Sequence, residues 1–311
     1  MRFQPSWLEE KCGLSKIESI FFPISIKSES LMWFKKRGVK LFINDPLPSK
    51  IPLLKGLLEN QKELFLDESR KYLANHVNKN PDFPQNPFKS WQTDLFSPLQ
   101  LDFLYFWRET TFALGETQRN LLAAAVKEVI SYWLSFPSKT PRGTLSPSEI
   151  LDYFILRNNQ MIFNSGEKVY VLQHAFPEIS EEVESSLYLV SLREVSSPDE
   201  KLTSEVLFHA WWLGNTDLNK AKTEIYNFAR EWGYSWQGVN DFSQYAKKSG
   251  KSEAAAFFWS SEGVPPKLNE EMIIYPIKKA FLHKFPKSSQ YFKMADRKKE
   301  EYDFLLILQK N

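Results

Sequence analysis

Residues 17–45 read IESIFFPISIKSESLMWFKKRGVKLFIND, and this stretch decides the fold class. Residues 17–24 are an apolar run rich in Ile and Phe, which is typical of a buried strand. Residues 28–38 begin with Ser-Glu-Ser, which can cap a helix, and end in Arg-Gly, which can close one. Residues 39–43 predict a second strand, and Pro46 moves the next helix beyond it. This succession predicts the opening of a doubly wound parallel sheet.

The rest of the chain separates into a helical part and a second set of strands. We expect an α/β core at 1–60 and 151–311 and a mainly helical insertion at 61–150, which a Pro/Ser-rich stretch at 138–148 closes. The last strand is expected to pair with residues near 291–292 as a C-terminal antiparallel hairpin. Insertion helices are expected at 61–78, 96–113 and 117–136. Later strands are expected at 160–163, 169–172, 186–192, 254–259 and 302–308, and later helices at 202–213, 218–232 and 269–284.

The composition is that of an ordinary globular protein, with 42% apolar and 25% charged residues and a net charge of +2, which argues neither for nor against nucleic acid. Cys12 is the only cysteine and the four histidines have no ligand-type spacing, so we expect no disulfide and no metal. The most apolar helical stretch, residues 120–136, is too short to span a bilayer. No secretory signal is evident, so we expect a soluble, cytoplasmic protein without membrane contact.

The order of these elements resembles the Dam-type family of DNA adenine methyltransferases. Residues 22–38 look like the family's first loop and helix, and residues 43–45 look like the end of its second strand. Residues 159–166 look like the strand and turn before the catalytic strand, which residues 187–189 resemble. The similarity is spread over residues 17–310 and rests on order and spacing. It implies a mostly parallel Rossmann-like methyltransferase sheet, S-adenosylmethionine chemistry on a flipped adenine, and a role in DNA modification.

The family's Phe-x-Gly-x-Gly loop is altered in this chain. Phe22 looks like the aromatic residue of the motif, but Ile26 and Ser28 stand where the family has glycines. Those glycines let backbone amides approach the methionine part of the cofactor, and a β-branched residue suits such a loop poorly. We expect the Ile26 side chain to fill this space, since apolar side chains are better placed inside than out. The departure implies no cofactor, or S-adenosylmethionine if the chain is active.

The end of the expected catalytic strand departs from the family in the same direction. The family's Asp-Pro-Pro-Tyr accepts hydrogen bonds from the adenine amino group and stacks on the base, and the aligned residues here are Val190, Ser191, Leu192 and Arg193. Valine cannot accept a hydrogen bond, so no catalytic residue is expected. Asp45 matches the acidic residue that binds the cofactor. It is either a vestige of that site or a turn residue that bonds local backbone amides.

A basic segment follows near the C-terminus, with aromatic residues interleaved. It is either a nucleic-acid-binding edge that contacts phosphates or a solvated helix end and hairpin. The basic residues expected to bind nucleic acid are Lys278, Lys279, Lys284, Lys287, Lys293, Arg297, Lys298 and Lys299.

These observations predict a catalytically degenerate DNA adenine methyltransferase-like protein that acts as a DNA-binding or protein-binding subunit. An intact apolar framework can keep binding surfaces after the catalytic residues are lost. One alternative is an active methyltransferase with a divergent cofactor loop. Another is a protein-interaction scaffold without nucleic-acid contact.

Overall fold

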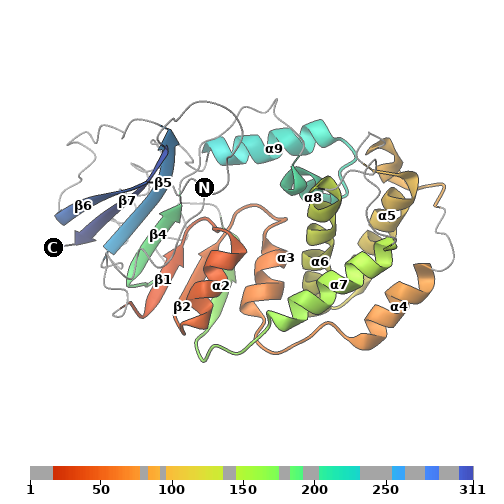
Figure 1. The fold of residues 1–311 in the computed structure, drawn as a ribbon, viewed down its shortest axis with the longest axis horizontal. Coiled ribbons are helices and arrows are strands. Elements are labelled where there is room, and N and C mark those ends of the chain that lie inside the picture. The colour runs from red at the N-terminus through yellow and green to blue at the C-terminus, as the bar shows by residue number, and fades with distance from the viewer. Residues whose placement is uncertain are drawn as a thin grey trace. The chain divides into compact units, whose positions relative to one another are not determined.

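The computed structural model describes residues 17–77, 83–91, 96–135, 145–174, 183–191, 203–231, 254–262, 277–286 and 301–310 (Figure 1). The chain divides into two compact units. The α/β unit comprises Met1–Pro46, Gly166–Ser196 and Phe228–Asn311. The helical unit comprises Leu47–Ser165 and Ser197–Asn227. The chain therefore leaves the α/β unit twice, after β2 and after β4.

The described part of the α/β unit contains one seven-stranded sheet of order β3-β2-β1-β4-β5-β7-β6. Strands β1 to β5 pair in parallel, whereas β7 runs antiparallel to both β5 and β6. The strands are β1 (Ser19–Phe22), β2 (Lys40–Asn44), β3 (Val169–Leu172), β4 (Leu187–Ser191), β5 (Ala254–Glu262), β6 (Ile277–Pro286) and β7 (Glu301–Lys310).

Alternation along the strands defines the face that α2 (Ser28–Lys36) covers. Ile20 and Phe22 of β1 pair with Leu41 and Ile43 of β2, and all four side chains are buried. Phe34 of α2 packs against Phe22 with ring centroids 5.7 Å apart. The apolar runs that predicted the two strands therefore supply the core beneath the helix.

The strand order reverses beside β1, because β2 and β3 lie on one side of it and β4 and β5 on the other. This is a topological switch point, and its parallel sheet is compatible with a Rossmann-like fold. The prediction of an α/β protein with a parallel sheet is confirmed. Strands expected near 17–24, 39–43, 169–172, 186–192, 254–259 and 302–308 are all present.

The strand predicted at 160–163 is wrong. Gln160 is the last residue of helix α7 (Pro147–Gln160), and the first residues of this helix overlap the Pro/Ser-rich stretch expected to close the insertion. Ser146 and Glu149 form a capping box, with Pro147 at the first position of the helix. Those residue types at a helix start are a capping signal rather than a linker signal.

The helix predicted at 269–284 is also wrong where the structure describes it, because residues 277–286 form strand β6. The pattern is ambiguous, since Ile277, Phe281 and Phe285 fit helical spacing and Phe281, His283 and Phe285 also fit strand alternation. Pairing with the apolar strand β7 decides it. β7 pairs with β5 and β6, and the expected partners at 291–292 lie outside the described residues.

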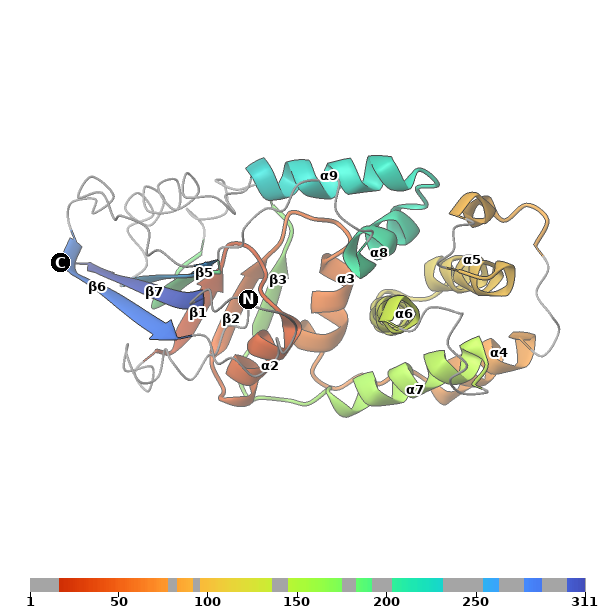
Figure 2. The ribbon, with the colours of Figure 1, turned by 45° about the horizontal axis from the view of Figure 1, so that its top comes forward.

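Helix α6 lies at the centre of the helical unit, with α3, α5, α7 and α8 around it (Figure 2). The core of the helical unit contains the buried residues Trp91, Trp107, Trp133 and Trp211, and the stacked rings of Trp107 and Trp133 have centroids 5.8 Å apart. No described helix combines the length and apolarity needed to cross a bilayer. The elements are α3 (Ile51–Leu54), the π-helix η2 (Lys55–Glu59), α4 (Asp67–Val77), the 3-10 helix η3 (Pro87–Trp91), α5 (Pro98–Ala113), α6 (Glu116–Ser135), α7, α8 (Ser204–Leu213) and α9 (Leu218–Glu231).

The helical unit is larger than the insertion predicted at 61–150. Residues 47–60, 151–165 and 197–227 also belong to it. The physical reason is that α3, α7 and α8 all pack against α6, so their apolar faces share one core.

Candidate functional site

The carboxyl edge of the parallel strands is the first place to look for a site, because open α/β sheets bind ligands there at the switch point. After β1 the chain runs through Pro23 to Lys27 and enters α2 at Ser28. Lys27 occupies the N-cap position, and its side chain makes no capping hydrogen bond. The loop thus connects the first strand of the parallel sheet to the helix that packs on it.

The apolar side chains of this loop, and of the strand residue before it, are buried. Phe22, Ile24 and Ile26 are all buried. Ile26 is therefore directed inward, as its apolar character led us to expect, whereas Ser28 is half-buried as the first residue of the helix. Glycines with positive φ in the described chain are Gly38, Gly166 and Gly214, and none of them is in this loop. The loop lacks the open backbone that a closely approaching cofactor needs.

Asp45 follows β2 and has a partner from the neighbouring loop. It is 2% exposed, and its Oδ2 accepts a hydrogen bond from Ser25 Oγ at 2.5 Å. Its backbone N–H donates to Leu172 O of β3 at 3.2 Å. The carboxylate thus receives, from the chain's own serine, the kind of O–H donor that a cofactor ribose would offer.

Asn44, at the end of β2, links the residue after β1 to a residue that follows β3. Its Nδ2 donates to Pro23 O at 3.1 Å and to His174 O at 3.2 Å, and its Oδ1 accepts from His174 N at 2.9 Å. Sequence reasoning missed both Asn44 and Ser25. An Asn-Asp pair directly after a buried strand was a usable signal, but the partners at 23, 25 and 174 have no local signature.

The remaining predicted positions of the sheet are described only in part. Val190 and Ser191 are the last residues of β4, where their backbone pairs with Phe257 and Phe258 of β5. Leu192 and Arg193 lie outside the described residues. The structure therefore brings the end of β4 to the same sheet edge as Asp45, on the other side of β1.

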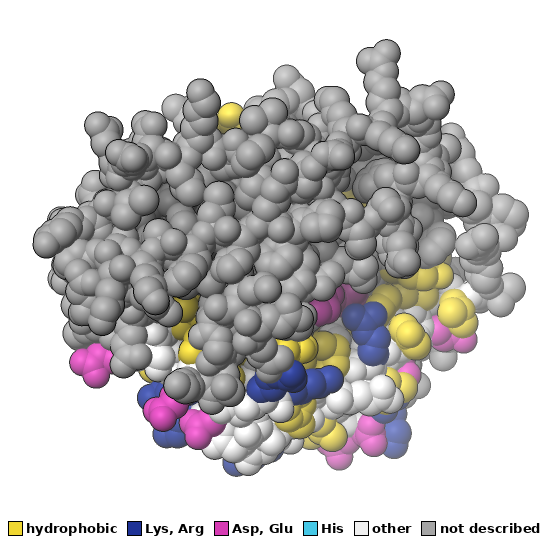
Figure 3. Space-filling view, turned by 60° about the vertical axis from the view of Figure 1, so that its left-hand side comes forward, with side chains coloured by type: hydrophobic (Ala, Val, Ile, Leu, Met, Phe, Trp, Pro, Cys, Tyr) yellow, Lys and Arg dark blue, Asp and Glu magenta, His cyan; other side chains and the backbone are white. Residues whose placement is uncertain are grey.

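Three of the predicted basic residues, Lys278, Lys279 and Lys284, belong to β6, which lies at one end of the strand order. On the face shown in Figure 3, described basic side chains lie beside acidic and hydrophobic ones. The other predicted basic residues, Lys287, Lys293, Arg297, Lys298 and Lys299, lie outside the described residues.

A second polar cluster lies in the helical unit. His209 of α8 is hydrogen-bonded through Nδ1 to Ser49 Oγ at 2.9 Å and through Nε2 to Glu224 Oε2 of α9 at 3.3 Å. A carboxylate only accepts, so Nε2 carries the hydrogen and Nδ1 of the neutral ring accepts from the serine. Burial lowers the pKa of His209, and the hydrogen bond to Glu224 opposes this shift.

This cluster has the residue types of a nucleophilic triad but not the access. Ser49 and His209 are each 2% exposed, so a substrate cannot reach the hydroxyl. The hydrogen bonds of these three residues therefore join the start of the helical unit to α8 and α9. Because Ser49 and His209 are 160 residues apart, no local sequence motif predicts their contact.

Lys35 is the other buried ionisable group of interest. It lies in α2 with its side chain fully buried, and burial lowers its pKa to about 8.

Among the described residues no group of His, Cys, Asp or Glu side chains is arranged to hold a metal ion. No protein-family model matches the chain, and no curated protein is significantly similar to it.

Proposed function

We propose that this chain is a non-catalytic protein of Rossmann-like methyltransferase architecture that acts as a binding subunit. The observation that carries the proposal is the closure of the carboxyl edge: Asp45 is buried against Ser25, and Ile26 is buried in the loop above β1. These residues do not fit S-adenosylmethionine, because both the carboxylate and the loop space are already used. The strand order around β1 supports the architecture, since β3-β2-β1-β4-β5 reverses direction at β1 as doubly wound sheets do.

Calorimetric titration of the purified protein with S-adenosylmethionine tests this directly. We expect no heat of binding up to about 1 mM ligand, a concentration at which binding would still contribute roughly 4 kcal/mol. A thermal-shift titration on the same sample detects binding that releases no heat. Micromolar affinity would overturn the proposal and favour the active methyltransferase, for which the position of Asp45 at the end of β2 is the supporting observation.

A substitution at the end of β4 separates the two defects. Val190→Asp restores the acidic side chain that the family uses on the target adenine, but Ile26 and Ser28 still occupy the cofactor loop. We therefore expect no methyl transfer to a defined oligonucleotide from Val190→Asp, measured with labelled S-adenosylmethionine. Activity from this single change would contradict the argument from the loop.

DNA is the partner that the basic residues of 278–299 favour. Each lysine that neutralises a phosphate releases a counterion, so binding should weaken as salt rises. Fluorescence anisotropy with a labelled duplex of about 20 base pairs at two salt concentrations measures this. Lys278→Ala/Lys279→Ala/Lys284→Ala should reduce both affinity and salt dependence.

A matched triple variant in other elements, Lys27→Ala/Lys62→Ala/Lys71→Ala, removes the same charge and should have a smaller effect. Equal loss in the two variants would show non-specific attraction. No binding by the wild-type protein at low salt would exclude DNA and leave a protein as the partner.

A further inference from the structure

The buried His209 ring has a different partner on each of its two nitrogens. Nδ1 accepts from the hydroxyl of Ser49 at 2.9 Å, and Nε2–H donates to Glu224 Oε2 at 3.3 Å. Ser49 is as buried as the ring, whereas the Glu224 side chain is 39% exposed. Ser49 belongs to the turn of residues 47–50 before α3, which is called the Ser49 turn. The ring therefore joins a buried hydroxyl on one side to a carboxylate that reaches water on the other.

The hydrogen bond of Ser49 requires a neutral ring. In the described part of the chain, Ser49 Oγ has no hydrogen bond besides the one to His209. Protonation adds a hydrogen to Nδ1, which then can only donate. The hydroxyl must turn its own hydrogen away from the ring, and a buried O–H group without an acceptor is unfavourable. Protonation thus removes the match with Ser49, while Nε2–H still donates to Glu224.

Burial and the charges of three segments act on the His209 ring. Burial has the largest influence and lowers the pKa of His209. Glu224 of α9 and Glu205 of α8 raise this pKa, and Lys50 of the Ser49 turn lowers it. Lys50 also forms an ion pair with Glu205, so the Ser49 turn contacts α8 through two neighbouring residues. A positive ring would therefore lie beside a cation on the side of the turn and beside a carboxylate on the side of α9.

We propose that His209 is a proton-dependent latch, which holds the Ser49 turn when the ring is neutral and releases this turn when the ring is protonated. α9 stays bound in both states, because the imidazolium still donates to Glu224 and then carries the opposite charge. The Ser49 turn is the first segment of the helical unit. The inference goes beyond the proposed function, because it concerns the response of the helical unit to pH and holds whether or not the chain binds DNA.

The burial of the ring sets the direction of the pH effect. When the Ser49 turn opens, water reaches Nδ1 and the pKa of the ring returns toward about 6.5, the value of a solvated histidine. The open form therefore binds the proton first as pH falls, and opening becomes more frequent below that pH. Between the pKa values of the open and closed forms, opening increases about tenfold for each pH unit.

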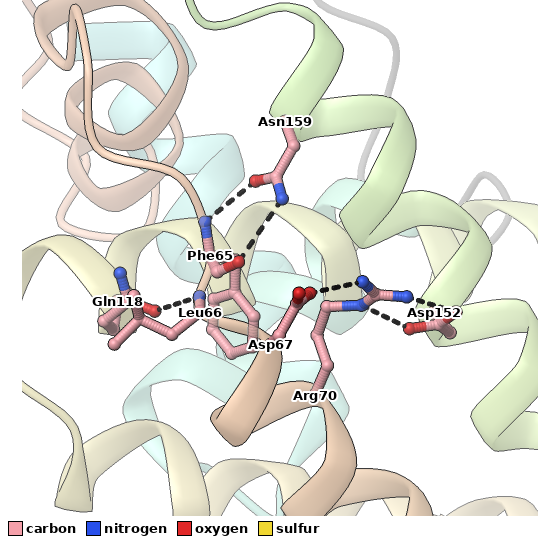
Figure 4. A network of polar contacts seen from close by, with 7 residues as sticks. All are labelled: Phe65, Leu66, Asp67, Arg70, Gln118, Asp152 and Asn159. Atoms are coloured by element: carbon pink, nitrogen blue, oxygen red, sulfur yellow. Dashed lines mark hydrogen bonds and ion pairs between the residues drawn. The ribbon is translucent and has the colours of Figure 1, made fainter.

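A second polar network of the helical unit provides an internal reference (Figure 4). Gln118 of α6 donates to Leu64 O and accepts from Leu66 N, both at 2.9 Å. Asn159 of α7 accepts from Phe65 N at 2.9 Å and donates to Phe65 O at 3.4 Å. Amide side chains do not titrate in this pH range, so the hydrogen bonds that hold this extended segment should not depend on pH.

Hydrogen exchange of the full chain, followed by mass spectrometry from about pH 7.5 to about pH 5.5 and corrected for intrinsic exchange rates, tests the latch. Protection of residues 47–54 should fall at least about threefold over this range, whereas residues 64–66 and 218–227 should keep their protection. Unchanged protection at 47–54, or a larger loss at 218–227 than at 47–54, overturns the proposal.

His209→Gln removes the titrating group, so protection of residues 47–54 should no longer depend on pH. His174→Gln, which replaces an exposed histidine of the α/β unit, is the matched control and should respond like the wild type. Circular dichroism establishes that both variants are folded. A pH response that persists in His209→Gln, or that disappears in His174→Gln, contradicts the assignment to His209.

Two further variants leave the ring in place and change one partner each. Ser49→Ala removes a donor to the neutral ring and should raise the pKa of His209. Glu224→Gln removes a negative charge beside the ring and should lower this pKa. NMR titration of the imidazole signals, with His209 assigned from its absence in His209→Gln, measures both shifts. An unchanged or lowered pKa in Ser49→Ala contradicts the role of the hydroxyl in the latch.

Discussion

At the carboxyl edge of the α/β unit, the polar side chains of Ser25, Asn44 and Asp45 bond to the chain itself, whereas the helical unit leaves large apolar side chains in water. Among the residues whose side-chain burial the structure describes, which leave out β5, β6 and β7, the large hydrophobic side chains that are more than 40% exposed belong to the helical unit. They are Leu64, Leu66, Tyr72, Leu99, Phe112, Leu145, Tyr153, Leu156 and Leu213.

The usual ligand-binding position of a doubly wound sheet and the exposed apolar side chains of this chain thus belong to different units. A doubly wound sheet binds its ligand at the switch point, and here that position is closed by Ile26 and by the Ser25–Asp45 hydrogen bond. Exposed apolar groups, by contrast, favour contact with another macromolecule. The proposed binding function therefore assigns binding to the outer surfaces of the chain and gives the sheet a structural role.

The largest expected effect tests the packing of the core of the helical unit. Trp211 is fully buried in the helical unit and its Nε1 donates to Leu104 O at 2.7 Å. Trp211→Ala should cost about 4 kcal/mol, because it leaves a large cavity and removes the hydrogen bond to Leu104 O. Denaturant unfolding followed by circular dichroism measures the loss. Trp212→Ala, at a half-buried neighbour, should cost clearly less, and equal losses would show that burial is not the cause.

A close helix contact provides the second test. A Cβ at Gly56 in η2 would lie 2.9 Å from the backbone of Asn120 in α6. Gly56→Ala should therefore cost about 2 kcal/mol, since the two helices must move apart. At Gly115 an added Cβ meets no atom within 4 Å, and Gly115→Ala should cost no more than about 1 kcal/mol. If the two variants melt alike, the close approach at Gly56 is not limiting.

Removing one atom tests the hydrogen bond that helps to close the sheet edge. Ser25→Ala removes the hydroxyl donor and leaves the buried Asp45 carboxylate with one hydrogen bond fewer, at a cost of about 1 to 2 kcal/mol. The thermal unfolding midpoint should fall, and Ser28→Ala in the adjacent helix turn is the comparison. We expect Ser25→Ala still to bind no S-adenosylmethionine, because Ile26 is unchanged. Binding by this variant would show that the serine alone had closed the site.

The smallest expected effect is a pH dependence in the helical unit. Burial lowers the pKa of His209 in the folded protein, so the unfolded state binds its proton first as pH falls. The contribution of the neutral ring is present above the unfolded pKa, about 6.5, and is lost as pH decreases through that value. Unfolding midpoints at several pH values between about 5 and 8 should show this slope, and His209→Gln should remove part of it. A slope identical in the variant would assign the dependence to other groups.

Local signals in the sequence were enough for much of the fold. The apolar runs at 17–24 and 39–43 predicted two strands, and residues 28–38 predicted the helix between them, although its N-cap is Lys27 rather than one of the serines. α7 was also specified locally, by Ser146, Pro147 and Glu149, but its capping box was read as a connection. β6 could not be assigned locally, since its spacing fits both helix and strand and pairing with β7 decides between them.

The candidate sites depend on contacts between distant residues. Asp45 was identified from its position after a strand, but its partner Ser25 belongs to another loop. The tie between Ser49 and His209, and the amides of Gln118 and Asn159 that hold residues 64–66, join parts of the chain that share no motif. Residue type and spacing can nominate such groups, whereas only the packed helices determine which of them meet.

Because the chain leaves the α/β unit and returns to it, all residues of the helical unit are synthesised before the last strands of the sheet. The helical unit contains no residue beyond Asn227, so its core can close while the ribosome is still adding the last strands. β1 and β2 are made first, yet their sheet is complete only after residues 301–310 have emerged to pair with β5. Strands Ser19–Phe22 and Lys40–Asn44 therefore belong to a sheet whose β5 edge lacks its partner until the end of the chain is made. A ribosome paused before β7 would hold a finished helical unit attached to an unfinished sheet.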